Sequence, residues 1–345
     1  MFDVTVVGMG PNGLSVLNEL NKCSLKVVGL DKGEVCNHIK SYPKDMVFFS
    51  TAEKLTLDNF EMGLGFGTNP TLQDACRYYE DFVDRNNLEI LTFSKVEKIS
   101  GKNNNFTLFL NKGKKIHSKK IVLTTGIYSN PNYIDIPGEK ELNVSHYYSG
   151  SEKLNKKEIL VVGAGNSAVE AAMDLSERNR VVLMFRKEGL DRKKIKSWIY
   201  PKFIDIVNSG KIEIINNASL ISLEDSEAII KTKFVGGAIF DPPSGKPERP
   251  FEKEIMSKMK MKFDYCFLLT GYKPDKKFLI EECGLELEGE LEVPKHNPKN
   301  YETTIKGIYI AGALVEGMNS HRVFIENGRL HGSPIAKDIY EKLQI

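Results

Sequence analysis

The sequence lacks the paired cysteines that mark zinc sites, disulfide frameworks and built-in redox dithiols. Its five cysteines stand at positions 23, 36, 76, 266 and 283, and neither C-x-x-C nor C-x-x-x-x-C occurs. An odd number of cysteines with irregular spacing argues against a disulfide scaffold and against a tetrahedral metal site. We therefore predict five free thiols and no metal site.

The chain also lacks an excess of charge and any long apolar run. Its 48 basic and 46 acidic residues leave a net charge of +2 over 345 residues. Composition therefore gives no argument for binding to nucleic acid or to a membrane. No apolar run approaches the ~20 residues of a membrane span. The first ten residues indicate a strand and a glycine turn rather than a signal peptide. We expect a cytoplasmic protein with two domains of ordinary size.

One pattern is present twice, about 155 residues apart. An apolar strand at 3–7 leads into Gly8-Met9-Gly10-Pro11-Asn12-Gly13, and one at 158–162 leads into Gly163-Ala164-Gly165-Asn166-Ser167-Ala168. Each turn is followed by a stretch with helical periodicity and then by a second apolar strand, at 25–30 and 180–185. Strands that alternate with helices indicate parallel sheets. The predicted fold class is α/β, with two Rossmann-like dinucleotide-binding domains.

The two glycine turns have the context that gives such motifs meaning, with a strand before and a helix after. The first glycine permits a tight turn, and the second lets a pyrophosphate approach the backbone. The third position, Gly13 or Ala168, lets helix and strand pack closely. Phosphates then meet free N–H groups at the positive end of the helix dipole. The alternative is that these are structural glycines of an ordinary α/β turn.

The residue that ends the second strand separates the two nucleotides. In the first unit it is Asp31, whose carboxylate can accept hydrogen bonds from ribose hydroxyls and repels a 2′-phosphate. In the second unit the corresponding residues are Arg186 and Lys187, with Arg192 shortly after. Cations there favour a 2′-phosphate, which a guanidinium can bind through two hydrogen bonds. The first site therefore suits FAD and the second suits NADPH.

The remaining segments are shorter and less regular. We expect strands near 90–99, 105–110, 121–125, 263–269 and 307–311, and a terminal helix over 324–343. The basic segment 111–120 is interpreted as a solvated hairpin tip, with docking of an acidic partner protein as the alternative. The proline-rich segment 241–250 cannot form regular structure.

Several stretches show a resemblance to a known family. The first glycine turn, Thr124-Thr125-Gly126, Ile136-Pro137-Gly138, the second glycine turn and Thr270-Gly271-Tyr272 follow one another as in two-dinucleotide flavoproteins. The architecture resembles thioredoxin reductase, whose NADPH domain is inserted into its FAD domain. Three longer stretches, 42–55, 196–201 and 324–332, resemble the YpdA, or bacillithiol disulfide reductase, branch. The resemblance implies an FAD domain of residues 1–128 and 271–345 and an inserted NADPH domain of residues 129–270.

Site residues follow from the glycine turns and from this resemblance. The residues expected to contact FAD are Gly8, Gly10, Pro11, Asn12, Gly13, Asp31, Lys32, Ser50, Thr51, Val96, Thr125, Gly126, Gly312, Ala313, Phe324 and Ile325. Those expected to contact NADPH are Gly163, Gly165, Asn166, Ser167, Arg186, Lys187, Arg192 and Gly271. The candidate catalytic groups near the flavin are Asn12 and His331. His331 can supply a proton, and a structural histidine is the alternative. Trp198 and Pro201 are expected to pack the inserted domain, or to lie near the NADPH entrance.

Two positions depart from the patterns that the resemblance implies. Related disulfide reductases carry a redox cysteine after the Gly-x-Gly-Pro, where this chain has Asn12. Thiol–disulfide exchange at the flavin then lacks its nucleophile, and Cys36 is expected to be a bystander. The wider superfamily has an acidic residue where this chain has Ala313, so one ribityl hydrogen bond must come from elsewhere.

The function predicted from these residues is reduction of flavin by NADPH, followed by reduction of a low-molecular-weight disulfide or related sulfur acceptor. A ferredoxin or flavodoxin reductase is the first alternative, because that reaction needs no catalytic thiol. A flavin monooxygenase fits less well, since His146 lies eight residues after Gly138 and the G-x-x-x-H spacing is missing. A flavin-bound redox sensor without enzymatic activity is the last alternative. We expect a homodimer, with a small-molecule acceptor or a small redox protein as partner and hinges at the two domain crossings.

Overall fold

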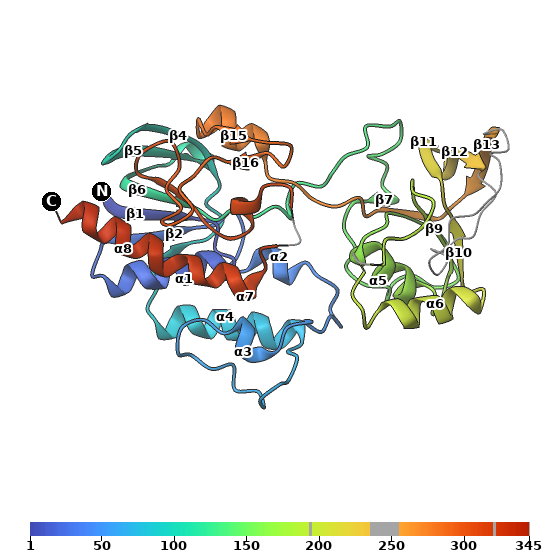
Figure 1. The fold of residues 1–345 in the computed structure, drawn as a ribbon, viewed down its shortest axis with the longest axis horizontal. Helices are drawn as coiled ribbons and strands as arrows, with labels where there is room; N and C mark the ends of the chain where they lie inside the picture. Colours follow the sequence, from blue (N-terminus) through green and yellow to red (C-terminus); the bar gives the residue numbers. More distant parts are fainter. Residues whose placement is uncertain (193–194, 235–254, 320–321, 345) are drawn as a thin grey trace, which may run out of the picture. The chain divides into compact units, whose positions relative to one another are not determined.

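The computed structural model describes residues 1–192, 195–234, 255–319 and 322–344 (Figure 1). The chain divides into two compact units: Met1–Asn130 with Tyr272–Ile345, and Pro131–Gly271. The first unit is therefore discontinuous in sequence, and the second is inserted into it. The proline-rich segment 241–250 lies outside the described residues. Within those residues, no helix is long and apolar enough to cross a membrane.

Unit 1 is built on a seven-stranded sheet with the order β3-β2-β1-β6-β5-β4, in which β17 also pairs with β6. Its parallel strands are β1 (Phe2–Val7), β2 (Val27–Leu30), β3 (Ile90–Leu91), β6 (Lys115–Leu123) and β17 (Ile308–Ile310). The antiparallel strands are β4 (Val96–Lys102) and β5 (Asn105–Leu110). Residues 4–7 of the central strand β1 are buried on both faces, as in a strand that is covered on both sides.

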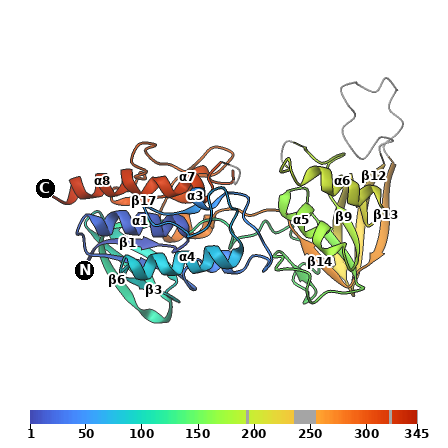
Figure 2. The ribbon, with the colours of Figure 1, turned by 90° about the horizontal axis from the view of Figure 1, so that it is seen from below.

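The helices of unit 1 pack on this sheet. Helices α1 (Pro11–Lys22) and α8 (Gly332–Leu343) lie side by side (Figures 1 and 2). The other elements are α2 (Asn37–Lys40), α3 (Ala52–Leu55), α4 (Leu72–Arg85), α7 (Ile325–Gly328), the short turns η1 (Asn111–Gly113), η2 (Phe278–Glu282), η3 (Gly312–Glu316) and η4 (Arg329–His331), and the hairpin β15 (Leu287–Glu288) and β16 (Val293–Pro294). Instead of one terminal helix over 324–343, the structure has α7, η4 and α8 in succession.

The basic segment 111–120 is mostly strand, and the prediction of a loop there is wrong for residues 115–120. Strand β6 begins at Lys115, and the connection before it consists of η1 and Lys114. Two polar residues of β6, Ser118 and Lys120, are buried. The Nζ of Lys120 donates to Oδ1 of Asn103 at 2.6 Å, so this cation is satisfied inside the unit. The charge of the segment 111–120 suggested an exposed loop. Residues 115–120 instead form a strand, because their backbone pairs with β1 and β5.

Unit 2 has a five-stranded parallel sheet with the order β10-β9-β8-β14-β7. Its strands are β7 (Val144–Ser145), β8 (Glu158–Val162), β9 (Arg180–Met184), β10 (Ile212–Ile215) and β14 (Tyr265–Leu268). Helices α5 (Asn166–Leu175) and α6 (Tyr200–Asn208) pack against it. A separate antiparallel sheet consists of β11 (Ala218–Glu224), β12 (Glu227–Phe234) and β13 (Ile255–Lys262).

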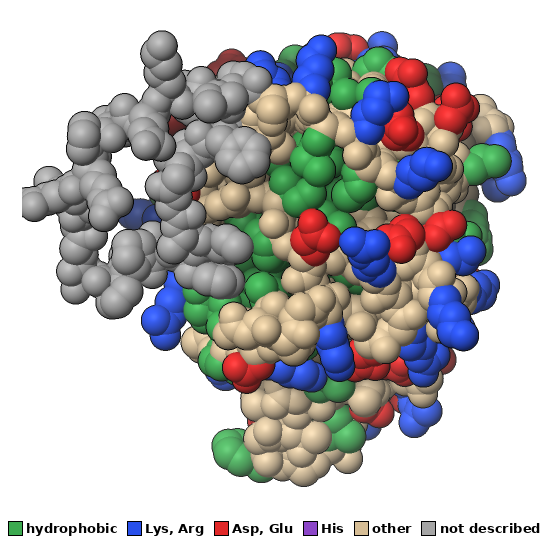
Figure 3. All heavy atoms as spheres, turned by 90° about the vertical axis from the view of Figure 1, so that its right-hand side faces the viewer, with side chains coloured by type: hydrophobic (Ala, Val, Ile, Leu, Met, Phe, Trp, Pro, Cys, Tyr) green, Lys and Arg blue, Asp and Glu red, His purple; other side chains and the backbone are tan. Residues whose placement is uncertain are grey.

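The packing role expected for Trp198 and Pro201 is wrong. Trp198 is 60% exposed, and Pro201, at the start of α6, is exposed as well. Ile199, between the two, is instead the residue that is buried in the core of unit 2. Figure 3 shows one face of unit 2, where side chains of both charges are interspersed over the surface.

Candidate cofactor sites

The first glycine turn has the geometry of a dinucleotide cradle. Gly8 has a φ of +103°, and a Cβ there would lie 2.6 Å from the Thr124 carbonyl oxygen. A Cβ on Gly13 would lie 1.9 Å from the Gly8 carbonyl oxygen, whereas Gly10 has nothing within 4 Å. No side chain caps the start of α1. The first and third glycines therefore permit packing, and the second leaves open space before free N–H groups, as a pyrophosphate requires.

Asp31, at the end of β2, is tied to this turn. Its Oδ2 accepts the Met9 N–H at 2.7 Å, and its Oδ1 accepts the Gly33 N–H at 2.8 Å. Each carboxylate oxygen keeps a further lone pair that can accept a ribose hydroxyl. The next residue, Lys32, is exposed. Val96, by contrast, buries its side chain in the sheet core, so that only its backbone is available to a cofactor.

Thr124 connects β6 to the same turn. Its Oγ1 donates to the Val7 carbonyl at 3.0 Å and approaches the Gly8 carbonyl at 2.5 Å. Thr125 and Gly126 follow at the end of β6, and Gly126 has a φ of +64°. The carboxyl ends of β1, β2 and β6 therefore meet at one edge of the sheet, which is where ligands bind in open α/β sheets.

Asn12 meets the C-terminal part of the chain. A Cβ on Gly312 would lie 2.7 Å from Asn12 Nδ2, and one on Gly328 would lie 2.6 Å from the same atom. Only glycine fits at these two positions while Asn12 keeps this orientation. Among the described residues, the buried Asn12 Oδ1 has no hydrogen-bond partner. Ala313, which follows Gly312, is half-buried. The structure thus brings the three predicted FAD contacts Asn12, Gly312 and Ala313 into one region.

His331 is buried behind this region. Its Nδ1 accepts the Gly312 N–H at 3.2 Å, and its ring stacks on Tyr301 with centroids 4.4 Å apart. Burial, with a smaller contribution from the charge of His296, lowers the pKa of His331 to about 4. The ring is therefore neutral at neutral pH, with Nδ1 as an acceptor. This geometry favours the structural alternative over a proton donor.

The segments around Ser50 and Phe324 also come together. Ser50 Oγ donates to Glu326 Oε2 at 3.0 Å, and the rings of Phe49 and Phe324 meet edge to face at 5.6 Å. Thr51 is the N-cap residue of α3, and Ile325 begins α7. The predicted residues Ser50, Thr51, Phe324 and Ile325 thus lie at one contact between α3 and α7.

Arg329, which was not among the residues predicted from the sequence, holds this contact together. Arg329 Nη1 donates to the Glu53 carbonyl at 3.0 Å and also to the Thr56 carbonyl, and its Nε donates to the Glu326 carbonyl at 3.3 Å. One guanidinium therefore joins the two segments. Its only signal in the sequence was its place inside the distinctive stretch 324–332.

The second glycine turn repeats the geometry of the first. A Cβ on Gly163 would lie 2.3 Å from the Leu269 carbonyl oxygen, whereas Gly165 has nothing within 4 Å. The start of α5 has no side-chain cap, and Ser167 in its first turn is exposed. Asn166 Oδ1 accepts the Lys196 N–H at 2.8 Å, so the segment that contains Trp198 is fastened to this turn.

The cations expected to recognise a 2′-phosphate follow β9. Arg186 and Lys187 are both exposed, and the Lys187 carbonyl accepts the Asn217 N–H at 3.0 Å. The guanidinium of Arg192 lies over the Tyr200 ring, 5.4 Å from its centroid. Gly271 has a φ of +91° and ends the unit, where its carbonyl accepts the Asn132 N–H at 2.9 Å. Gly271 thus lies in the crossing segment, two residues after Leu269, which contacts Gly163.

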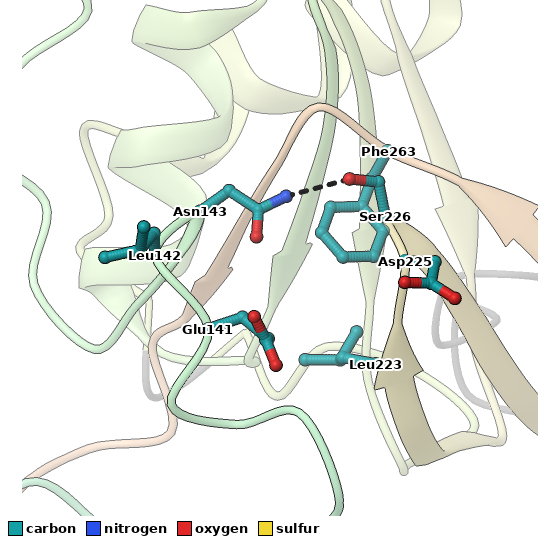
Figure 4. Close-up of a pocket in the computed structure, with 7 residues that line it drawn as sticks. All are labelled: Glu141, Leu142, Asn143, Leu223, Asp225, Ser226 and Phe263. Atoms are coloured by element: carbon teal, nitrogen blue, oxygen red, sulfur yellow. Dashed lines mark hydrogen bonds between the residues drawn. The ribbon is translucent and has the colours of Figure 1, made fainter.

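Unit 2 also has a small pocket that shares no residue with the glycine turn (Figure 4). Asn143 and Ser226 meet across it, with Nδ2 donating to Oγ at 3.2 Å. The carboxylates of Glu141 and Asp225 lie at its rim, and Leu223 and Phe263 are among its apolar lining. No ligand chemistry follows from these residues alone.

Comparisons with known proteins agree with this geometry. Residues 5–243 match the family model described as "Pyridine nucleotide-disulphide oxidoreductase". The chain is 32% identical to bacilliredoxin reductase Bdr of Bacillus subtilis, over 98% of this chain and 97% of that one. The structure of bacillithiol disulfide reductase Bdr (YpdA) from Bacillus cereus is similar, with a TM-score of 0.88, 30% identity and 99% of each chain covered. Thioredoxin reductase of T. acidophilum shares the fold, with a TM-score of 0.71 and 19% identity over 100% of this chain and 99% of that one.

The predicted fold class and the predicted resemblance are confirmed. The two glycine turns fit a pair of dinucleotides, and the family and its relatives imply FAD and NADPH as the cofactors of an oxidoreductase. The chain therefore belongs to the pyridine nucleotide-disulphide oxidoreductase family, whose thioredoxin-reductase-like architecture it shares.

Proposed function

We propose that this enzyme reduces a low-molecular-weight disulfide of the bacillithiol type, or a bacilliredoxin that carries one, at the expense of NADPH. The observation that carries the proposal is the difference between two similar turns. In unit 1 the strand after the glycine turn is followed by Asp31, whose carboxylate binds that turn, whereas in unit 2 the strand after the glycine turn is followed by the exposed cations Arg186 and Lys187. An acid selects a ribose diol and cations select a phosphorylated ribose. Unit 1 is thus proposed to hold FAD and unit 2 to hold NADPH. The names of the relatives support the sulfur acceptor.

The protein's own groups have defined tasks in this proposal. When bound, the two cofactors supply hydride transfer and two-electron redox chemistry. The N–H groups at the start of α1 hold the FAD pyrophosphate, and Asp31 orients its ribose. Arg186 and Lys187 bind the 2′-phosphate, and the start of α5 holds the NADPH pyrophosphate. Ser50, Thr51, Phe324 and Ile325 are proposed to form the wall beside the flavin ring.

The acceptor step is shaped by Asn12. A carboxamide has no nucleophilic sulfur, so the exchange with a disulfide cannot begin at this turn as it does with a cysteine. We propose that Asn12, with Gly312 and Gly328 packed against it, would form the side of the FAD site where the acceptor binds. The same observation favours a second candidate function, electron transfer to ferredoxin or flavodoxin, because that reaction requires no protein thiol.

An anaerobic stopped-flow experiment distinguishes the two functions. The NADPH-reduced holoprotein is mixed with bacillithiol disulfide, with a bacilliredoxin mixed disulfide, with ferredoxin or with flavodoxin, and flavin reoxidation is followed. We expect rapid reoxidation by one of the sulfur acceptors and slow reoxidation by the protein carriers. Reoxidation only by ferredoxin or flavodoxin would establish the second function instead. An Asn12→Cys variant in the same assay measures what the missing thiol contributes.

The assembly and location of the enzyme are further proposals. We infer a homodimer, because symmetric dimers are the commonest oligomers, and light scattering of the purified protein tests it. We infer a cytoplasmic location, which the five free cysteines support, because free thiols persist in a reducing compartment.

A further inference from the structure

Two cysteines that are far apart in sequence share one part of the unit 1 core. Cys36 immediately precedes α2 and is 2% exposed, and Cys76 lies in the first part of α4 and is half-buried. Helices α2 and α4 are in contact. Cys36 belongs to the apolar cluster under these helices, and Cys76 packs against that cluster. The sequence spacing of 40 residues gave no sign of this proximity.

An ion pair between the same two helices fixes their alignment. Lys40 Nζ lies 2.8 Å from Glu80 Oε1. The Lys40 N–H donates to the Cys36 carbonyl at 3.2 Å, so Lys40 stands one helical turn after Cys36. Glu80 stands four residues, and therefore about one turn, after Cys76 on the same face of α4. The ion pair thus joins the end of α2 to the face of α4 that carries Cys76, one turn from each cysteine in the sequence.

The electrostatics of the thiols agree with this arrangement. Burial raises the pKa of Cys36 well above its usual value, and a charge on Cys76 raises that pKa further. Burial also raises the pKa of Cys76, with opposing effects from Lys40 and Glu80. Cys76 is therefore near enough to Cys36 to affect the ionisation of the Cys36 thiol.

We propose that Cys36 and Cys76 form a dithiol that closes into an intramolecular disulfide when the protein meets a low-molecular-weight disulfide. A disulfide requires Cα atoms within roughly 7 Å. Helix α2, which Cys36 immediately precedes, contacts α4, which contains Cys76, so the two segments lie side by side. The proposal concerns a site away from the catalytic thiol position of the family, and it does not depend on the proposed function.

The reaction balances as two successive exchanges. The thiolate of Cys76, the more exposed of the two, attacks one sulfur of the disulfide RSSR and expels RS⁻, which leaves a mixed disulfide on Cys76. The thiolate of Cys36 then attacks the Cys76 sulfur and expels the second RS⁻. The two protons lost by the cysteines are taken up by the two leaving thiolates, so two protein thiols are oxidised and RSSR is reduced to two RSH.

Closure of this bond has a consequence for the nucleotide turn. The Cys36 N–H donates to the Met9 carbonyl at 2.9 Å, and Met9 lies between Gly8 and Gly10 of the FAD cradle. Cys36 itself is held at a φ of +54°, a conformation that non-glycine residues rarely adopt. A bond from its sulfur to α4 fixes this residue further, so we expect the redox state of the pair to change flavin affinity.

Peptide mapping of the full-length holoprotein tests the proposal. The native protein is incubated with glutathione disulfide as the probe, then denatured and blocked with N-ethylmaleimide, digested without reductant and analysed by mass spectrometry. The expected product is a peptide in which Cys36 is joined to Cys76, with Cys23, Cys266 and Cys283 alkylated. A Cys266→Ser variant, with the substitution in unit 2, serves as a matched control and should give the same linked peptide.

Two variants resolve the order of the steps. Cys36→Ser should trap glutathione on Cys76, whereas Cys76→Ser should trap none on Cys36. Both should still be reduced by NADPH, which separates failure of this proposal from failure of the proposed function. Stable glutathione on Cys76 of the native protein, or no Cys36–Cys76 peptide under conditions that oxidise other thiols, would overturn the inference. The native-protein result decides the matter even where a variant folds poorly.

Discussion

The carboxylate of Asp31 accepts the backbone N–H of Met9 at 2.7 Å, so the acid at the end of β2 holds the middle of the glycine turn. We propose that the same group has two tasks, because it fixes the cradle and is placed to receive the ribose. A hydrogen bond to a charged acceptor contributes about 1.5–3 kcal/mol. This dual role gives Asp31 a larger influence on FAD binding than ribose contact alone implies.

Asp31→Asn removes the charge but preserves the size of the side chain. We expect flavin affinity to fall at least tenfold, which corresponds to about 1.4 kcal/mol. Flavin content after gel filtration and fluorescence titration of the apoprotein measure this loss. Asp3→Asn is the matched control, because Asp3 also accepts a backbone N–H, from Lys26 at 2.9 Å, at the opposite end of β1. Equal losses in both variants would contradict the assignment.

Two glycines of the first turn, Gly10 and Gly13, should respond differently to an added methyl group. Gly13→Ala places a Cβ 1.9 Å from the Gly8 carbonyl and should destabilise even the apoprotein by several kcal/mol. Gly10→Ala has nothing within 4 Å and should leave apoprotein stability within about 0.5 kcal/mol. It should nevertheless prevent flavin retention, because the methyl group fills the space of the pyrophosphate. Thermal unfolding of both apoproteins and their flavin content provide the comparison. If the Gly10→Ala protein retains FAD normally, the pyrophosphate does not bind at this turn.

Arg186→Ala tests nucleotide choice in unit 2. Loss of the guanidinium should raise KM for NADPH at least tenfold and leave KM for NADH nearly unchanged, because only NADPH carries the 2′-phosphate. Arg180→Ala is the matched control, since the Arg180 side chain is 67% exposed at the start of β9, the strand that Arg186 follows. Steady-state kinetics with both nucleotides measure the effect. If KM rises equally for NADH and NADPH, Arg186 has no role in phosphate recognition.

His331 should make stability depend on pH. Its folded pKa of about 4 lies below the usual value of 6.5, so the unfolded chain binds more protons between these values. Stability should therefore fall as the pH drops from about 6.5 towards 4, by at most about 3 kcal/mol. Protonation also removes the acceptor of the Gly312 N–H. His331→Gln should flatten this part of the profile of Tm against pH, and the exposed His117→Gln should not. An unchanged slope in His331→Gln would assign the pH dependence to other groups.

Local patterns carried much of the information about the cofactor sites. The glycines of both turns, Asp31 and the pair Arg186 and Lys187 could be predicted as cofactor contacts because each signal lies within one β-turn-α-β unit. Strand, turn and next strand are close in sequence, so spacing alone reports their geometry.

Contacts between distant segments could not be read in this way. The packing of Asn12 against Gly312 and Gly328, the bridge made by Arg329, and the approach of Cys36 to Cys76 all depend on tertiary placement. Burial also changed the meaning of single residues. His331 was a candidate proton donor by type, but its enclosed position and its bond from Gly312 favour a structural role. Lys120 was assigned to a solvated loop by charge, whereas pairing of β6 buries it.

The central claim is that charge at the ends of two similar strands sorts FAD into unit 1 and NADPH into unit 2. Anaerobic titration of the purified holoprotein with NADPH and, separately, with NADH tests it most directly, with the visible absorbance of the flavin as the signal. The account predicts a yellow protein that one equivalent of NADPH bleaches and that NADH bleaches only at far higher concentration. A protein that cannot be reconstituted with FAD, or that NADH and NADPH bleach alike, would contradict it.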